Sequence, residues 1–202
     1  MKVFRSFIAL SALVLAAATA KAQSGISLGE PAYNGSGCPI GSASATITPD
    51  GKTLSLLFDS FIAEAGNTTG RRIDRKSCNL RVPVHVPQGY SVAVIGVDYR
   101  GFNAIPGNGA YTELRNEYFY AGSRGPVFQK RFNGPRAEDY TQTNKLIATS
   151  LIWSECGKDV NLAINSSIVA MSNSQMQQTM MTVDSVDISA GLIYSLQWRR
   201  CN

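Results

Sequence analysis

Residues 79–86, with the sequence NLRVPVHV, place an apolar side chain at every second position. Leu80, Val82 and Val84 share one face, and polar residues and a proline occupy the other. A period of two predicts a β-strand with one buried face. Pro83 has no backbone N–H to donate, so this strand is expected at a sheet edge or with a bulge. Similar patterns recur on both sides of this stretch, and no segment shows a convincing helical period.

The other strand candidates are separated by short segments rich in Gly, Pro, Asn and Asp. They cover residues 42–48, 54–58, 90–99, 111–120, 127–132, 146–153, 160–171, 182–189 and 192–199. About ten short strands without intervening helices predict two packed antiparallel sheets rather than βα units. We therefore expect an all-β, jelly-roll-like β-sandwich, with a closed barrel as the alternative.

The N-terminal segment has the pattern of a secretory signal. Lys2 and Arg5 form a positive region, residues 7–18 are almost entirely apolar, and Ala20-Lys-Ala22 offers small residues at the two positions that signal peptidase reads. The apolar run is shorter than the roughly 20 residues that a membrane span needs. We predict a signal peptide at residues 1–22 and a single β-sandwich domain at residues 23–202.

Cleavage changes the charge of the protein. The full chain has a net charge of +5 and a pI near 9.1, but Lys2, Arg5 and Lys21 lie in the signal. The remaining 16 basic and 14 acidic residues give a net charge of +2. The basic pI therefore does not indicate a nucleic-acid partner or an anionic membrane surface. We expect no nucleic-acid binding, and no membrane insertion once the signal is removed.

Four cysteines remain in the exported chain: Cys38, Cys78, Cys156 and Cys201. An even number of cysteines in an exported protein predicts two disulfides, with three available connectivities. We favour Cys38–Cys78 and Cys156–Cys201, because each pair lies within one half of the chain. Trp-x-x-Cys endings on two strand candidates, Trp153–Cys156 and Trp198–Cys201, also favour the second pair.

The residue inventory gives little support for catalysis. His85 is the only histidine, it falls on the polar face of its strand, and no Gly-x-Ser-x-Gly motif is present. One histidine and paired cysteines supply no zinc site, so no metal, cofactor or catalytic residue is predicted. Glycoside hydrolysis needs only two carboxylates. The candidate acids are Asp59, Glu64, Asp98, Glu113, Glu117, Asp184 and Asp187.

Aromatic and polar residues cluster between positions 99 and 120. Tyrosine combines an apolar ring with a polar tip, which suits sugar stacking or a protein interface. The candidate binding residues are Tyr99, Arg100, Phe102, Tyr111, Tyr118 and Tyr120. The competing interpretation is that half of each set fills the core, because alternation sends Tyr118 and Tyr120 to the face opposite Phe119. Asn67, in a polar Asn-Thr-Thr turn, is the best glycosylation acceptor if the source is eukaryotic.

Nine short motifs occur in an order that resembles a known family. They are Ser36-Gly-Cys-Pro39, Pro49-Asp-Gly51, Leu57-Phe-Asp-Ser-Phe61, Cys78-Asn-Leu80, Pro87-Gln-Gly89, Asp98-Tyr-Arg-Gly101, Tyr118-Phe-Tyr-Ala-Gly122, Trp153-Ser-Glu-Cys-Gly157 and Leu196-Gln-Trp-Arg-Arg-Cys201. Together they resemble the secreted family catalogued as domain of unknown function 4360. The resemblance implies a small, exported, cysteine-paired protein and brings no catalytic residues. Glu155 departs from the proline that the family pattern leads us to expect.

The sequence thus predicts a secreted protein without catalytic activity that binds cell-surface glycan or protein. Its location would be extracellular, or the periplasm or cell envelope in a Gram-negative bacterium. Two alternatives remain: a carboxylate-dependent polysaccharide hydrolase or lyase, and a structural coat or matrix component. The residues do not indicate an oligomeric state.

Overall fold

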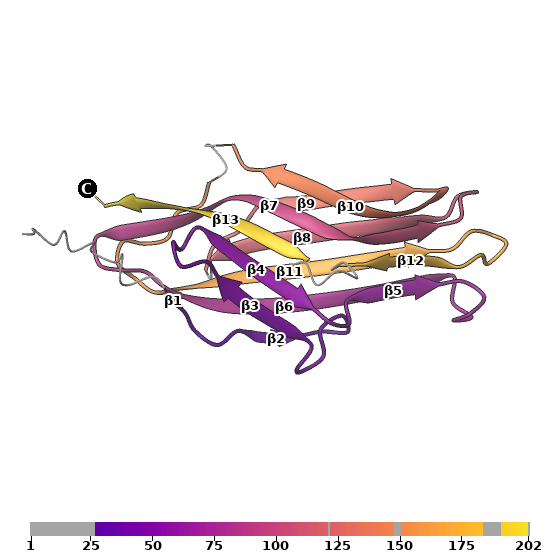
Figure 1. The fold of residues 1–202 in the computed structure, drawn as a ribbon, viewed down its shortest axis with the longest axis horizontal. Coiled ribbons are helices and arrows are strands. Elements are labelled where there is room, and N and C mark those ends of the chain that lie inside the picture. The colour runs from indigo at the N-terminus through magenta and orange to yellow at the C-terminus, as the bar shows by residue number, and fades with distance from the viewer. Residues whose placement is uncertain (1–26, 121, 148–150, 184–190, 202) are drawn as a thin grey trace, which may run out of the picture.

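The computed structural model describes residues 27–120, 122–147, 151–183 and 191–201. The described chain is an elongated sandwich of two antiparallel sheets, and every regular element in it is a strand (Figure 1). The described part accordingly holds no helix of the length and hydropathy that would cross a bilayer. The predicted signal peptide lies outside the described residues.

Sheet A has six strands, and its order is β1-β6-β11-β8-β9, with β2 also pairing with β6. The strands are β1 (Ser27–Leu28), β2 (Ala32–Asn34), β6 (Ile73–His85), β8 (Tyr111–Tyr120), β9 (Val127–Asn133) and β11 (Val160–Met171). The central ladder joins β6 to β11 over their whole common length, from Val84 opposite Val160 to Ile73 opposite Met171. Pro83 lies opposite Gly29, between the two short strands β1 and β2 that edge the sheet.

Sheet B has seven strands in the order β3-β4-β13-β7-β12-β5, with β10 also pairing with β7. The strands are β3 (Ala43–Ile47), β4 (Thr53–Phe58), β5 (Ile62–Ala65), β7 (Tyr90–Ile105), β10 (Arg136–Lys145), β12 (Thr179–Thr182) and β13 (Leu192–Arg200). The long strand β7 is the centre of this sheet. It pairs with β13 and β12 on one side and with β10 on the other.

The core lies between the sheets and consists of the inward-facing alternate residues of both. Leu80, Val82 and Val84 of β6 are at most 3% exposed, which confirms the face predicted from their alternation. Leu54 and Leu56 of β4 are fully buried from the opposite sheet. The fold is therefore the predicted all-β sandwich of two sheets rather than the closed barrel.

Both predicted disulfides are present, Cys38–Cys78 and Cys156–Cys201. The expected turns also form. Gly51 adopts a φ of 68° and donates its backbone N–H to the Thr48 carbonyl at 2.8 Å, which closes the hairpin between β3 and β4. A positive φ of this size is costly for residues with a side chain, so glycine is the favourable residue here.

Two segments differ from the sequence prediction. Residues 146–153 were predicted to form a strand, but the described residues of this segment contribute only an isolated bridge between Trp153 and Ala93. Conversely β10, with the sequence RAEDYTQTNK, was not predicted, because only Tyr140 among its residues is an apolar side chain buried in the core. The 182–189 prediction falls mostly outside the described residues.

A candidate ligand-binding pocket at the second disulfide

Three of the six predicted binding residues face the interior. Tyr99, Tyr118 and Tyr120 are 0%, 2% and 8% exposed and belong to the core cluster. The rings of Tyr99 and Tyr118 are therefore not available to a ligand, which corrects the predicted binding role of these two residues. Tyr120 is largely buried but lines one wall of the pocket described below. The physical reason is parity, because all three lie on the inward face of their strands.

The core satisfies the hydroxyl groups of these tyrosines. Asn116 of β8 donates its side-chain N–H groups to the hydroxyl oxygens of Tyr99 at 3.4 Å and Tyr194 at 3.1 Å. The Asn116 carbonyl oxygen accepts a hydrogen bond from the Ser166 hydroxyl. Tyr120 donates its hydroxyl to the Val92 carbonyl at 3.0 Å. Burial raises the pKa of Tyr99 to about 12, because the phenolate would be poorly solvated there.

The other three predicted residues lie on opposite outer faces of the sandwich. Arg100 and Phe102 are half-buried on the outer face of sheet B, where the Arg100 Nε has no hydrogen-bond partner among the described residues. Tyr111 is half-buried on the outer face of sheet A, with the Arg131 guanidinium 4.0 Å from its ring centroid. The six residues therefore do not form one surface.

A pocket of about 380 Å³ lies where β8 ends and β11 begins. It is lined by residues from two segments of the chain: Tyr120, Gly122 and Ser123 from the first, and Ile152, Trp153, Ser154, Glu155, Lys158, Asp159, Val160 and Asn161 from the second. We call it the end pocket. Its volume is within the range of small-molecule sites.

Backbone hydrogen bonds hold the second segment beside β7. Ser154 donates its N–H to the Val92 carbonyl at 2.9 Å, and Val92 returns its N–H to the Ser154 Oγ at 3.0 Å. Gly157 donates to the Tyr90 carbonyl at 2.8 Å. The disulfide between Cys156 and Cys201 then ties this segment to the end of β13. The wall of the end pocket is thus fixed by covalent and backbone bonds.

Trp153 is a half-buried aromatic residue that lines the end pocket. Its backbone pairs with Ala93 of β7, and the Arg199 guanidinium of β13 lies 4.0 Å from its ring centroid. A cation over an aromatic face at this distance is an attractive contact. Arg199 therefore covers one face of the ring and fixes the orientation of a side chain that also lines the pocket.

Three charged side chains that line the end pocket with Trp153 have partners: Glu155, Lys158 and Asp159. The Lys158 Nζ lies 2.9 Å from the Glu155 Oε2, and the His85 Nδ1 lies 2.7 Å from the Asp159 Oδ1. Asp159 also accepts the Val86 backbone N–H at 3.1 Å. The sequence placed His85 on a polar face but gave no sign of its partner, because His85 and Asp159 meet only through the pairing of β6 with β11.

The geometry offers little of what a glycosidase needs. Glu155 and Asp159 are 73% and 68% exposed and are each paired with a basic side chain, whereas a general acid is usually held in an apolar environment. None of the acids predicted from sequence that the structure describes lines the end pocket. Glu113 and Glu117 lie on the outer face of sheet A, Asp98 lies on that of sheet B, and Asp184 and Asp187 fall outside the described residues. Within the described residues, no three His, Cys, Asp or Glu side chains meet in a metal-binding group.

The end pocket also gathers four of the nine motifs quoted above. Two of them, Tyr118–Gly122 and Trp153–Gly157, contribute lining residues. In a third, Pro87–Gly89, the Gln88 Nε2 donates to the Gly157 carbonyl of the second segment. The fourth, Leu196–Cys201, supplies Arg199.

The sequence profile of the family described as a domain of unknown function, DUF4360, matches residues 24–201. The chain belongs to this family.

A relative in the fungus Arthroderma benhamiae is 30% identical over 169 residues, which is 84% of this chain and 69% of that protein. It is described as an uncharacterized secreted protein. This relative and the two disulfides place the present protein outside the cell, because disulfides persist in oxidising compartments.

Two solved structures show a faint likeness to this chain. One is TmCBM61 in complex with β-1,4-galactotriose, with 12% identity, a TM-score of 0.27, and coverage of 85% of this chain and 88% of that chain. The other is the Eiger TNF of S. frugiperda, with 14% identity, a TM-score of 0.23, and coverage of 62% and 94%. At TM-scores this low the two likenesses support no conclusion about this chain.

Proposed function

We propose that this protein is an extracellular binding protein without catalytic activity that holds a glycan in the end pocket. The observation that carries the proposal is the combination of Trp153 with polar and charged side chains around one pocket of about 380 Å³. This combination suits sugars, which present apolar C–H faces and rings of hydroxyl groups.

Each part of the end pocket matches one part of a sugar. An indole ring buries apolar surface against a C–H face. The carboxylates of Glu155 and Asp159 accept hydrogen bonds from hydroxyl groups, and Lys158 and Asn161 donate them. All four polar residues are exposed, so their free lone pairs and protons reach a ligand without a rearrangement of the fold.

The rigid frame favours binding rather than turnover. The ion pairs, the Trp153–Arg199 contact and the disulfide hold the side chains before a ligand arrives. Pre-organisation lowers the entropy that is lost on association. Binding at an open pocket needs no exclusion of water, which agrees with the exposure of the polar side chains that line the end pocket.

The test is binding of the oxidised, mature protein to polysaccharides. Wild type is incubated with insoluble cellulose, chitin, β-1,3-glucan, xylan and mannan, and the bound fraction is measured. Trp153→Ala is expected to weaken binding about tenfold, since an aromatic contact of this kind contributes about 1.5 kcal/mol. Tyr111→Ala is a matched control, because an arginine also lies 4.0 Å from its ring, but Tyr111 begins β8 whereas the pocket lies at the other end of that strand.

Three outcomes would overturn the proposal. They are failure to bind any of the polysaccharides, equal binding by Trp153→Ala and wild type, and release of reducing sugar during incubation. The last result would instead favour the hydrolase alternative. Far-ultraviolet circular dichroism and thermal unfolding of both variants establish that each remains folded.

A further inference from the structure

A groove of about 450 Å³ crosses the outer face of sheet B beside the end pocket. Its lining comes from the neighbouring strands β7, β10 and β13 and from the segment after β10: Ile95, Gly96, Val97, Asp98, Thr143, Lys145, Leu146, Leu151, Ser195 and Gln197. We call it the sheet groove. Neither the sequence pattern nor the family assigns a role to it.

Gly96 lies in the middle of the sheet groove. It is paired with Lys145 of β10 on one side and with Ser195 of β13 on the other, next to a β-bulge. A Cβ built on Gly96 meets nothing nearer than the Asn144 carbonyl oxygen at 3.5 Å, so the fold leaves room for a side chain that the sequence does not supply. A glycine within a strand lets another molecule approach the backbone closely.

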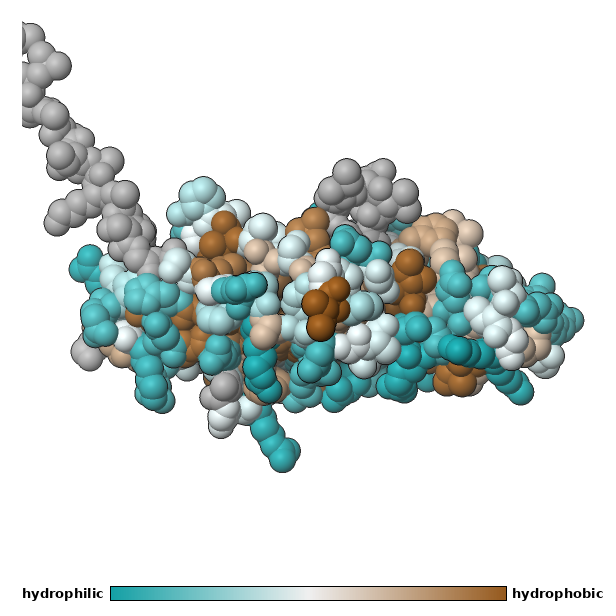
Figure 2. Space-filling view, turned by 90° about the horizontal axis from the view of Figure 1, so that it is seen from below, coloured by the Kyte–Doolittle hydropathy of each residue, from teal (hydrophilic) through white to brown (hydrophobic). Residues whose placement is uncertain are grey.

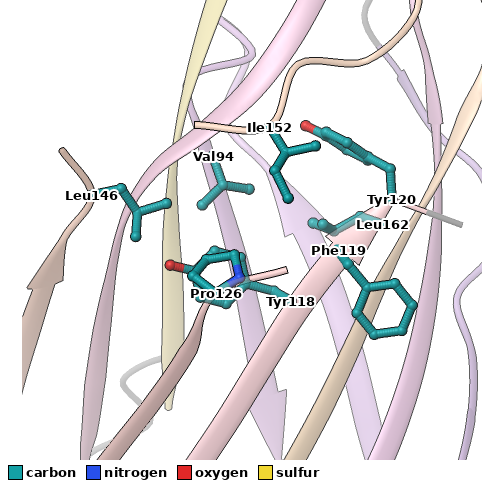
Figure 3. A pocket seen from close by; sticks show the side chains of 8 residues that line it. All are labelled: Val94, Tyr118, Phe119, Tyr120, Pro126, Leu146, Ile152 and Leu162. Atoms are coloured by element: carbon teal, nitrogen blue, oxygen red, sulfur yellow. The ribbon is translucent and has the colours of Figure 1, made fainter. Parts of the chain in front are cut away.

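The sheet groove and the end pocket are linked by shared walls. A small crevice of about 10 Å³ lies between them, and its lining includes Leu146, which also lines the sheet groove. The same crevice includes Tyr120 and Ile152, which also line the end pocket. Figure 3 shows Leu146 on one side of this crevice and Ile152 with Tyr120 on the other. The crevice has room for about one water and is lined in part by buried side chains, so the two larger hollows are linked over its Leu146–Ile152 rim rather than through it. They are also neighbours along β7, because Gln197 of the sheet groove and Trp153 of the end pocket both pair with Ala93.

The length of this path exceeds one sugar. Trp153 pairs with Ala93, and Asp98 lies five residues further along β7. At about 3.3 Å per residue, the two positions are roughly 16 Å apart. A ligand that occupies both hollows must therefore be a chain of several units.

The polar groups of the path do not favour a charged ligand. Asp98 in the sheet groove accepts a hydrogen bond from the Thr143 hydroxyl at 2.6 Å, and Lys145 on the same strand as Thr143 provides the opposite charge. Glu155 and Asp159 in the end pocket are paired as described above. With histidine counted as neutral, three carboxylates (Asp98, Glu155 and Asp159) are balanced by Lys145, Lys158 and the Arg199 guanidinium over Trp153. This balance favours a neutral polymer with many hydroxyl groups.

We infer that the ligand is an extended neutral polysaccharide that runs from the end pocket across the Leu146–Ile152 crevice into the sheet groove over Gly96. This inference rests on the proposed function of the end pocket and adds the chain length, the path and the charge class of the ligand. Trp153 anchors one end of the chain, and the flat floor at Gly96 lets the sugar rings lie against β7.

The experiment measures affinity against chain length by titration calorimetry. The probes are cello-, laminari-, xylo- and manno-oligosaccharides of two and six units, with tetragalacturonic acid as the charged comparison. For the series that binds, the six-unit ligand is expected to bind at least about tenfold more tightly than the two-unit ligand. Gly96→Val should fill the groove and reduce six-unit affinity to the two-unit value, with the two-unit affinity unchanged.

Ala104→Val is the matched control, because it enlarges a side chain on the outer face of the same strand, away from the sheet groove. It should leave both affinities unchanged, whereas Trp153→Ala should lower both. Equal affinity for two and six units, unchanged six-unit binding by Gly96→Val, or tighter binding of tetragalacturonic acid would overturn the inference. Those results leave two-unit binding at Trp153 intact, whereas failure of every oligosaccharide to bind overturns the proposed function as well.

Discussion

The two disulfides close loops of similar length in very different surroundings. Cys38–Cys78 spans 40 residues and Cys156–Cys201 spans 45, so the chain-entropy model assigns each about 4 kcal/mol of stabilisation. Cys38 and Cys78 are completely buried in the core, whereas Cys156 is exposed and Cys201 is partly exposed. Burial, and not loop length, is what distinguishes them. The first disulfide belongs to the fold, and the second belongs to the candidate site.

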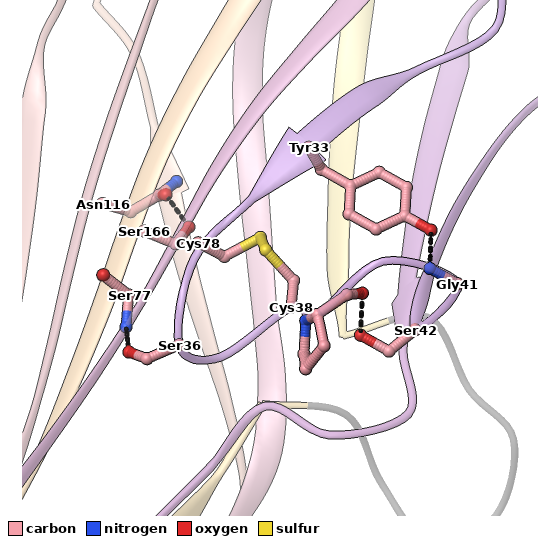
Figure 4. The surroundings of a disulfide bond; sticks show 10 residues. Tyr33, Ser36, Cys38, Gly41, Ser42, Ser77, Cys78, Asn116 and Ser166 are labelled. Carbon is pink, nitrogen blue, oxygen red and sulfur yellow. Dashed lines mark hydrogen bonds between the residues drawn. A yellow bond between two sulfur atoms is a disulfide. The ribbon is translucent and has the colours of Figure 1, made fainter.

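The first disulfide fixes the N-terminal part of the chain to sheet A (Figure 4). Ser36 accepts the Ser77 backbone N–H at 3.1 Å beside it, and Tyr33 accepts the Gly41 N–H at 2.9 Å. In the sheet, Cys78 is paired with Ser166, whose hydroxyl donates to Asn116. The bond therefore adjoins the polar network that satisfies the buried tyrosines.

The second disulfide lies near the surface of the molecule. Cys201 donates its N–H to the Gly89 carbonyl at 2.8 Å, and its sulfur lies 3.5 Å from the Ser91 hydroxyl. Seen from below in Figure 2, the surface shows apolar residues as separate patches among hydrophilic ones rather than as one continuous face.

Removal of the first disulfide should have the largest effect on stability. Cys38→Ala with Cys78→Ala is expected to lower the free energy of unfolding by about 5 kcal/mol, because the lost crosslink is accompanied by lost packing in the core. Urea unfolding followed by tryptophan fluorescence measures this change. At a temperature where the variant is folded, its glycan binding should match that of wild type.

Removal of the second disulfide should cost less stability and more function. Cys156→Ser with Cys201→Ser is expected to lower the free energy of unfolding by about 4 kcal/mol or less, since Cys156 is exposed and Cys201 is only partly buried. Hydrogen exchange of residues 151–157 should accelerate in the folded state, and glycan affinity should fall at least about tenfold. Equal losses of stability in the two double variants would contradict the distinction by burial.

The sequence supports the fold better than the site, for reasons visible in single strands. In β6 only one face is apolar, so the alternation identified the buried face directly. In β8 both faces carry aromatic and polar residues, so alternation put Tyr118 and Tyr120 on one face but did not show that this face is the buried one. Asn116, a polar residue, is fully buried there, because Ser166 and two tyrosine hydroxyls satisfy it. Side-chain polarity alone could not reveal that partnership.

The end pocket was beyond sequence reasoning for a related reason. Its residues come from segments that meet only when β8 and β11 pair, and its aromatic ring lies in a segment predicted to be a strand. The Trp153–Cys156 motif was the available signal, but it was used only to favour a disulfide. Both disulfide predictions are confirmed, so that motif carried structural information and, in our proposal, functional information too.

Alkaline pH should weaken the core, because five buried tyrosines hold their protons there. Burial raises the pKa of Tyr99 to about 12 and also raises the pKa values of Tyr118, Tyr120, Tyr140 and Tyr194 above 10. The folded state therefore keeps these protons above pH 10, where the unfolded chain loses them. The contribution of these protonated hydroxyls to the free energy of unfolding is therefore fully present below pH 10. It is lost as the pH rises toward 12.

For each such tyrosine the free energy of unfolding should fall by about 1.4 kcal/mol per pH unit within this window. Urea unfolding between pH 8 and pH 11 measures the slope. Tyr99→Phe should reduce the slope by the contribution of one tyrosine. A free energy of unfolding that is constant up to pH 11 would contradict the assignment of these hydroxyls to the core.

The smallest effect on stability is expected at the ion pair of the end pocket. The Lys158–Glu155 pair is 66% and 73% exposed, and exposed pairs contribute well under about 1 kcal/mol. Lys158→Met should therefore change the free energy of unfolding by less than about 0.5 kcal/mol, yet it removes a donor from the end pocket and frees the Glu155 carboxylate.

Arg115→Met is a matched control, because its 3.8 Å pair with Glu117 is also solvent-accessible but lies on the outer face of sheet A. If Lys158→Met binds glycan more weakly while Arg115→Met and both stabilities are unchanged, the pair serves the ligand rather than the fold. Equal glycan affinity of the two variants would instead confine the role of the end pocket to Trp153 and the remaining polar side chains.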